Sequence, residues 1–158
     1  MGNINDIVND IDRQSPLLAG ERSSFLLSLM ALSAYVVQID GDFGMYKYSY
    51  VRNFIATHYD AEKAAHCDGL LSRIFFERQR HNPLTWAALI EACAREVASY
   101  TSAEERMLIL DYLIFIAQAD GRVNQNEVIA VTNAAVWLGI SPVAGVKINE
   151  LKSKITQP

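Results

Sequence analysis

The sequence predicts an all-α protein, a single-domain bundle of about seven helices that contains two pseudo-symmetric helix–turn–helix repeats. Apolar residues recur at helical spacing, and no segment alternates convincingly at a period of two, so no sheet is expected. Half of the 158 residues are hydrophobic, which is enough for a sizeable core in one domain. The phrase VQIDGDF at 37–43 returns as AQADGRV at 117–123, and a repeat at fixed spacing indicates two copies of one unit.

The first repeat follows a segment of a different character. Residues 1–20 are polar and poorly patterned, and we interpret them as a leader to a helical domain over 21–158. A first helix is expected over about 22–39, and it is apolar on nearly every side, which indicates burial. Gly41 then interrupts the pattern, because glycine suits the left-handed position after a helix end. A second helix is expected over about 46–58.

Local start signals precede the remaining helices. Asp60 and Asn82 are favourable N-caps, and Asn82 is followed by a proline at the first helical position. Ser102 and Asn124 each precede a glutamate by three residues, which is the spacing of a capping box. Ser141 and the proline after it start the last helix. The expected ranges are about 60–80, 83–98, 103–119, 125–138 and 141–154.

The repeated Asp-Gly turns are the candidate functional site. Asp40 and Asp120 follow buried helices, whose C-terminal ends carry the negative end of the helix dipole. Each aspartate therefore needs a cation, a basic side chain or hydrogen bonds from the backbone of the turn. Asp120 and Glu127 together offer carboxylate oxygens of the kind that bind Ca²⁺ or Mg²⁺, and Asp40 would join them from the other repeat. The spacing differs from that of an EF-hand.

A purely structural interpretation of the same residues stays open. In it the glycines end helices, Asp40 and Asp120 brace their own turns, and Glu127 is only the capping-box acid of Asn124. Lys47 stands in the first repeat where Glu127 stands in the second, and its ammonium would neutralise the carboxylates without a metal.

Asp111 interrupts the most apolar helix of the chain. A buried carboxylate needs a partner. Two interpretations are open, an ion pair with an Arg or Lys at the rim of the bundle, or a polar lock between helices.

Composition and motifs argue against several classes of protein. The net charge of −4 disfavours a nucleic-acid partner, and no apolar run reaches the roughly 20 residues of a membrane span. No signal peptide, phosphate loop or nucleophile elbow is recognisable, so we expect a non-enzymatic, cytoplasmic protein. Cys67 and Cys93 form no CxxC pair and are expected to be buried free thiols. No histidine spacing fits a zinc site, and surface or boundary positions are expected for all three, His58, His66 and His81.

Several stretches resemble the TerB-like family, which includes the tellurite-resistance protein TerB and the N-terminal region of the co-chaperone DjlA. They are LSAYVVQIDGDF (32–43), YVRNF (50–54), IAQADGRVNQNEVIAV (116–131) and LGIS (138–141). The resemblance implies about seven helices in two related halves, and a divalent-cation site formed by Asp40, Asp120 and Glu127. Lys47 stands where the first copy in the family often has a glutamate. The His-Pro-Asp triplet of a J domain does not occur in the sequence, so direct stimulation of a chaperone ATPase is not expected.

The expected function is that of a non-enzymatic helical interaction module with an unidentified protein partner. A divalent cation between the two Asp-Gly turns belongs to this hypothesis, as does a role in stress response or co-chaperone assembly. Two alternatives are a scaffold domain without metal, in which Lys47 is the internal counter-ion, and a metal- or stress-sensing protein in which cation binding shifts the packing of the two halves.

Overall fold

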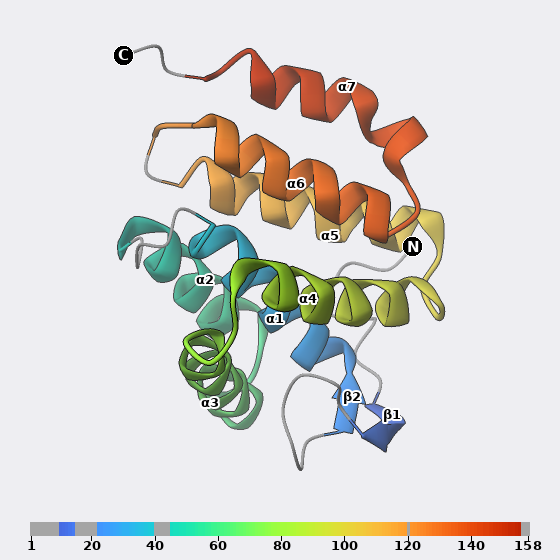
Figure 1. Cartoon of the computed structure of the whole chain (residues 1–158). Helices are drawn as coiled ribbons and strands as arrows, with labels where there is room; N and C mark the ends of the chain where they lie inside the picture. Colours follow the sequence, from blue (N-terminus) through green and yellow to red (C-terminus); the bar gives the residue numbers. More distant parts are fainter. Residues whose placement is uncertain (1–9, 15–21, 40–44, 120, 156–158) are drawn as a thin grey trace.

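A computed structural model describes residues 10–14, 22–39, 45–119 and 121–155 of the chain. Within these residues the chain forms seven helices and one pair of short strands, which confirms the all-α prediction (Figure 1). The elements are β1 (Asp10–Gln14), β2 (Arg22–Ser24), α1 (Phe25–Val37), α2 (Met45–His58), α3 (Ala61–Arg78), α4 (Pro83–Ala98), α5 (Ala103–Ala117), α6 (Gln125–Trp137) and α7 (Ser141–Lys152).

The expectation that no sheet would be present is wrong at the N-terminal end. Strands β1 and β2 pair antiparallel, with Asp10 opposite Ser24, and β1 falls within the segment interpreted as a leader. The first helix therefore begins at Phe25 rather than near residue 22. Both strands are short and polar, so they carry no apolar alternation that would have indicated a sheet.

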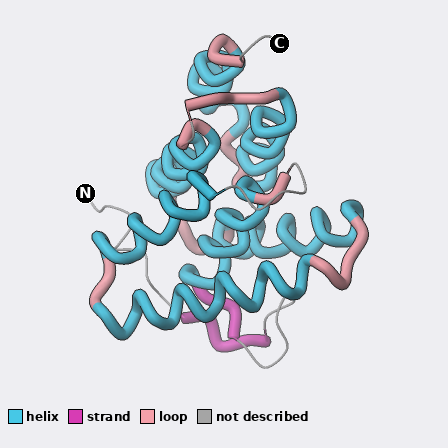
Figure 2. The backbone as a smooth tube through the Cα atoms, turned by 90° about the vertical axis from the view of Figure 1, so that its left-hand side faces the viewer, coloured by secondary structure: helices cyan, strands magenta, loops and turns pink. Residues whose placement is uncertain are grey.

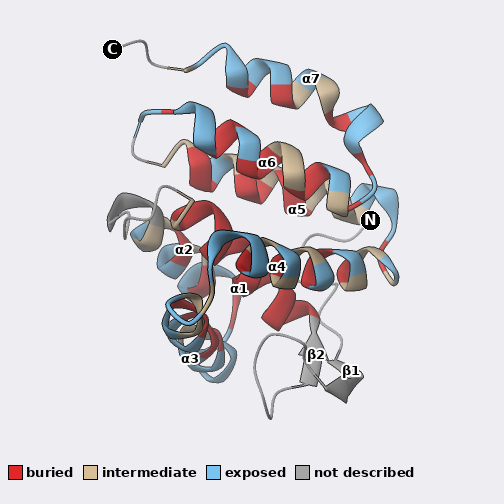
Figure 3. Cartoon of the chain, in the orientation of Figure 1, coloured by how far each residue is buried: buried red, intermediate tan, exposed pale blue. Residues whose placement is uncertain are grey.

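Helix α1 is the centre of the bundle. All of its residues are buried, and it packs against α3, α4, α5 and α6 (Figure 3). A helix that is apolar all round needs neighbours on every side, and this surrounding layer supplies them. Helices α5, α6 and α7 are stacked at one end of the molecule, and the strand pair lies at the other end in both views (Figure 2).

Four of the predicted helix starts are confirmed by side-chain hydrogen bonds. Asp60 and Asn82 cap α3 and α4, and their side chains accept the backbone N–H three residues on. Ser102 and Asn124 form complete capping boxes at the starts of α5 and α6. The predicted repeats correspond to α1–turn–α2 and α5–turn–α6. Their pseudo-symmetry stays a prediction.

Candidate functional site

The second Asp-Gly turn joins α5 to α6. Gly121 has a φ of 79°, the left-handed conformation that favours glycine, and its N–H donates to the carbonyl of Gln118 at 2.9 Å. Asp120 lies outside the described residues. Glu127, in the first turn of α6, is only 1% exposed. The described part of this turn therefore holds a carboxylate at the start of a helix, where the positive end of the dipole favours it.

Glu127 has the capping role that the structural interpretation gave it. Its Oε1 accepts the Asn124 N–H at 2.9 Å, and its own N–H donates to Asn124 Oδ1 at 2.9 Å. This geometry fits a cation site as well, because a carboxylate has two oxygens and hard cations prefer oxygen ligands.

The first Asp-Gly turn, between α1 and α2, holds the remaining residues of the predicted site. Asp40 and Gly41 lie outside the described residues, as does the side chain of Lys47, whose backbone belongs to the first turn of α2. In the described part of the chain, no three His, Cys, Asp or Glu side chains gather as metal ligands. Both the cation and the Lys47 counter-ion stay predictions.

Asp111 occupies the rim of the bundle, as one of its two interpretations predicted. Lys147 of α7 donates from Nζ to Asp111 Oδ1 at 2.5 Å, and both side chains are partly exposed. An ion pair at this exposure links α5 to α7 with little net energy, typically 0–1 kcal/mol. A polar link between buried helix surfaces does exist, but other residues form it.

That link joins α1 to α5. The hydroxyls of Ser33 and Tyr112 lie 2.7 Å apart, and Ser33 Oγ also donates to the carbonyl of Leu29 at 2.7 Å. Burial raises the pKa of Tyr112, so its hydroxyl stays protonated and needs the partner that Ser33 supplies. A second contact, from Asn133 Nδ2 to Tyr35 Oη at 3.2 Å, joins α6 to α1. These hydrogen bonds fix the relative positions of three helices.

The cysteines and histidines lie where the sequence predicted. Cys67 and Cys93 are free and buried, and burial raises their pKa values to about 11 and about 12. Both thiols are therefore protonated at neutral pH and poor nucleophiles. His58 and His66 are exposed and His81 is partly buried.

A hollow between α2 and α5 is the feature that sequence reasoning missed. We call it the aromatic groove; it has a volume of about 320 Å³. It is lined by Tyr50, Phe54, His58, Leu108, Asp111, Tyr112 and Phe115. Phe115 is 59% exposed, so its ring is accessible from solvent beside the other aromatic lining residues. The only signal in the sequence is that α5 is apolar on nearly every side and has more apolar faces than neighbours to cover them.

Packing inside the aromatic groove is well defined. The ring of Phe54 stacks on His58 with centroids 4.3 Å apart, and it lies 4.5 Å from Tyr112. His58 Nδ1 is also 3.0 Å from the carbonyl of Phe54. Because Tyr112 is tied to α1 through Ser33, the floor of the groove is anchored to the centre of the bundle. The groove is therefore a preformed apolar surface.

Comparison with known proteins gives one match. No curated protein and no solved structure matches the chain significantly. Among the described residues, no helix has the length and hydropathy needed to cross a bilayer. The family described as "Tellurite resistance protein TerB" matches residues 26–149, which is most of the chain and all but the edges of its helical bundle. The chain therefore belongs to the TerB family.

Proposed function

We propose that this protein is a non-enzymatic binding module of the TerB family that docks an amphipathic helix of a partner protein in the aromatic groove. The observation that carries this proposal is the exposed Phe115 above an anchored aromatic floor. The family description names tellurite resistance, and the process that we propose for this chain is a stress response in the cytoplasm.

The composition of the groove supports a protein ligand. Tyr, Phe and His side chains dominate its lining, and aromatic residues are enriched at the centres of protein interfaces. An apolar groove between two helices can bind a third helix, whose apolar residues at i, i+3, i+4 and i+7 point into the groove. The groove thus selects for an amphipathic helix rather than for a polar loop.

Charge narrows the class of partner further. The chain has a net charge of −4, and this overall charge carries the argument, because Asp111, which lines the groove, is already paired with Lys147 of α7. Basic residues flanking the apolar face of the partner helix would be attracted, and acidic ones repelled. We therefore propose a partner helix with an apolar face and a basic flank.

A displayed library of amphipathic helical peptides, selected against the full chain, tests the docking site. Selected peptides should bind with basic flanks, and Phe115→Glu should weaken binding at least about tenfold by placing a charge in the apolar groove. Phe76→Glu is the matched control, because Phe76 is 67% exposed on α3 and does not line the groove. Equal loss in both variants, or none in Phe115→Glu, would contradict the proposal.

A second proposed function rests on Glu127. We propose that Asp40, Asp120 and Glu127 hold a divalent cation of the Ca²⁺ or Mg²⁺ type, and the buried carboxylate of Glu127 at the start of α6 supports this. Isothermal titration with Ca²⁺ and Mg²⁺ tests it. Absence of heat would favour the scaffold alternative with Lys47 as counter-ion. Binding accompanied by altered amide exchange in both α1–α2 and α5–α6 would favour the sensor alternative.

A further inference from the structure

A second hollow lies where the end of α1 meets the turn between α3 and α4 and the start of α4. We call it the Arg78 pocket; its volume is about 220 Å³. Sites for drug-sized ligands are larger, about 300–1,000 Å³, so this one fits a group the size of a single residue. Its lining includes Tyr35, Gln38, Ile39, Arg78, Pro83 and Trp86.

Arg78 supplies a positive charge that the described residues do not neutralise. Its Nη1 donates to the carbonyl of His81 at 3.1 Å, and its guanidinium lies 5.9 Å from the ring centroid of Trp86. No carboxylate of the described residues is within ion-pair distance of Arg78, and none of them lines the pocket. A guanidinium held in place with donors to spare is suited to a carboxylate ligand.

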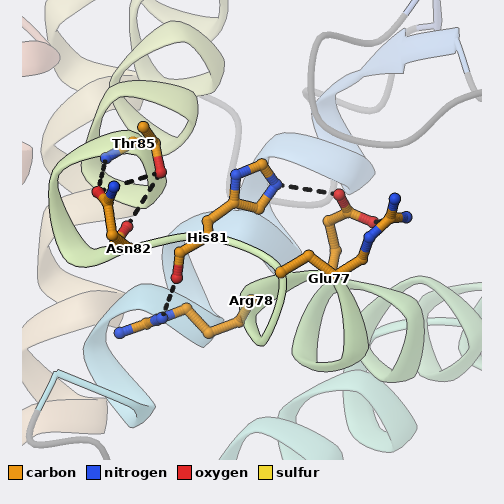
Figure 4. Close-up of polar contacts among 6 residues, drawn as sticks. Glu77, Arg78, His81, Asn82 and Thr85 are labelled. Carbon is orange, nitrogen blue, oxygen red and sulfur yellow. Dashed lines mark hydrogen bonds and ion pairs between the residues drawn. The ribbon is translucent and has the colours of Figure 1, made fainter.

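Glu77, the residue before Arg78 on α3, contacts other side chains. Glu77 Oε2 lies 3.0 Å from His81 Nε2, and Glu77 Oε1 accepts from Arg80 at 3.5 Å. Figure 4 shows the side chains of Glu77 and Arg78 leaving the end of α3 in different directions, with the Arg78 guanidinium below the His81 carbonyl. Among the described residues, Glu77 therefore leaves the Arg78 guanidinium without a carboxylate partner.

Gln38 supplies the complementary group. Its Oε1 is buried and has no hydrogen-bond partner among the described residues. A buried acceptor without a donor is costly, so a ligand that brings an N–H there relieves that cost. Gln38 directly follows α1, whose C-terminal end also attracts N–H donors and cations.

The two ends of the pocket thus have opposite polarity. The start of α4, marked by the Asn82 cap and Pro83, carries the positive end of a helix dipole, and the end of α1 carries the negative end of another. The walls between them are apolar, formed mainly by Tyr35, Ile39 and Trp86. A ligand matching this arrangement has a carboxylate, a nearby N–H donor and an apolar side chain.

We infer that the Arg78 pocket binds the carboxylate of an apolar α-amino-acid unit, with Arg78 holding the carboxylate and Gln38 accepting from the neighbouring nitrogen. A peptide C-terminus and a free amino acid both present this chemistry. The inference is independent of the aromatic groove, because the two sites share no lining residue.

Isothermal titration of the full chain with three probes tests the ligand class. The probes are acetyl-glycyl-leucine, its C-terminal amide and free leucine. The acid should bind at least about tenfold more tightly than the amide, because a charged hydrogen bond to Arg78 is lost. Tighter binding of free leucine than of the acetylated acid identifies an amino-acid site, and weaker binding identifies a chain-end site. The inference is overturned if acetyl-glycyl-leucine and its amide bind with equal affinity. It is also overturned if neither acetyl-glycyl-leucine nor free leucine gives heat of binding.

Variants then assign the two contacts. Arg78→Gln should weaken acetyl-glycyl-leucine at least about tenfold, and Gln38→Met about fivefold, since it removes one neutral hydrogen bond. Gln38→Met should not lower the melting temperature, because the buried oxygen that it removes has no described partner, so it tests the pocket even if Arg78→Gln folds poorly. Arg80→Gln is the matched control from the same turn, with a side chain 69% exposed. Full affinity in Gln38→Met and Arg78→Gln, or equal weakening in Arg80→Gln, overturns the assignment.

Discussion

Replacing Glu127 by glutamine separates its capping role from its proposed cation role. Glutamine serves at the third position of a capping box as glutamate does, so the hydrogen bonds between residues 124 and 127 are retained. The substitution removes the negative charge of a residue that is only 1% exposed, in the first turn of α6. The change isolates that charge from the geometry around it.

The expected magnitude without metal is small. A charge in the first turn of a helix contributes about 0.3–1 kcal/mol, and the burial of Glu127 places it near the upper end of that range. For a chain of this size, 1 kcal/mol corresponds to about 2–4 °C in melting temperature. Glu127→Gln should therefore melt about 2–4 °C below the parent in chelator.

In Ca²⁺ the melting temperatures of the parent and of Glu127→Gln should differ more than in chelator. A ligand present at 100 times its Kd stabilises the native state by about 2.7 kcal/mol, which raises the melting temperature by about 5–11 °C in the parent. Glu127→Gln should lose most of this increase. Thermal unfolding followed by circular dichroism, in chelator and in Ca²⁺, measures both effects.

Glu105→Gln is the matched control. Glu105 closes the capping box of α5 with Ser102, away from the Asp-Gly turns, so this variant changes a capping charge but no proposed ligand. It should keep the full response to Ca²⁺. If the parent shows no response, or if Glu127→Gln responds as strongly as Glu105→Gln, the cation proposal is refuted and Glu127 is only a capping residue.

Three further outcomes follow from the packing. Ser33→Ala should destabilise the fold by about 1–3 kcal/mol, because the buried Tyr112 hydroxyl loses its partner, and adding Tyr112→Phe should recover part of that loss in urea unfolding. Lys147→Met should cost less than about 1 kcal/mol, because its ion pair with Asp111 is partly exposed, and a loss of several kcal/mol would show a buried lock instead. Cys93 should react with thiol reagents only at the rate of unfolding. Burial raises the pKa of the Cys93 thiol from 9.0 to about 12, so the folded state favours the neutral thiol. The free energy of unfolding should therefore fall as pH rises above 9.0, which urea midpoints measured at several pH values would show.

Local signals predicted the helices well because their physics is local. A cap such as Asn82 with the following proline needs only neighbouring residues to set a helix start, and α4 begins where this signal placed it. The burial of α1 also followed from its own composition, since a helix without a polar face requires surrounding helices.

The features that sequence reasoning missed depend on residues far apart in the chain. The pairing of β1 with β2 is set by backbone hydrogen bonds between short polar segments, which leave no pattern. The aromatic groove brings Phe54 of α2 beside Tyr112 of α5, and the Arg78 pocket brings Gln38 toward α4. Neither juxtaposition can be read from spacing along one helix. The Asp-Gly turns differ from these features, because their repeat is visible in the sequence. Asp40 and Asp120 themselves lie outside the described residues.

Amide hydrogen exchange of the full chain, with and without a selected amphipathic peptide, tests the docking claim most directly. We expect added protection to be concentrated in α2 and α5, whose side chains line the aromatic groove. Protection centred on α3 or α4, with α2 and α5 exchanging as in the free protein, would place the partner elsewhere and contradict the proposed function.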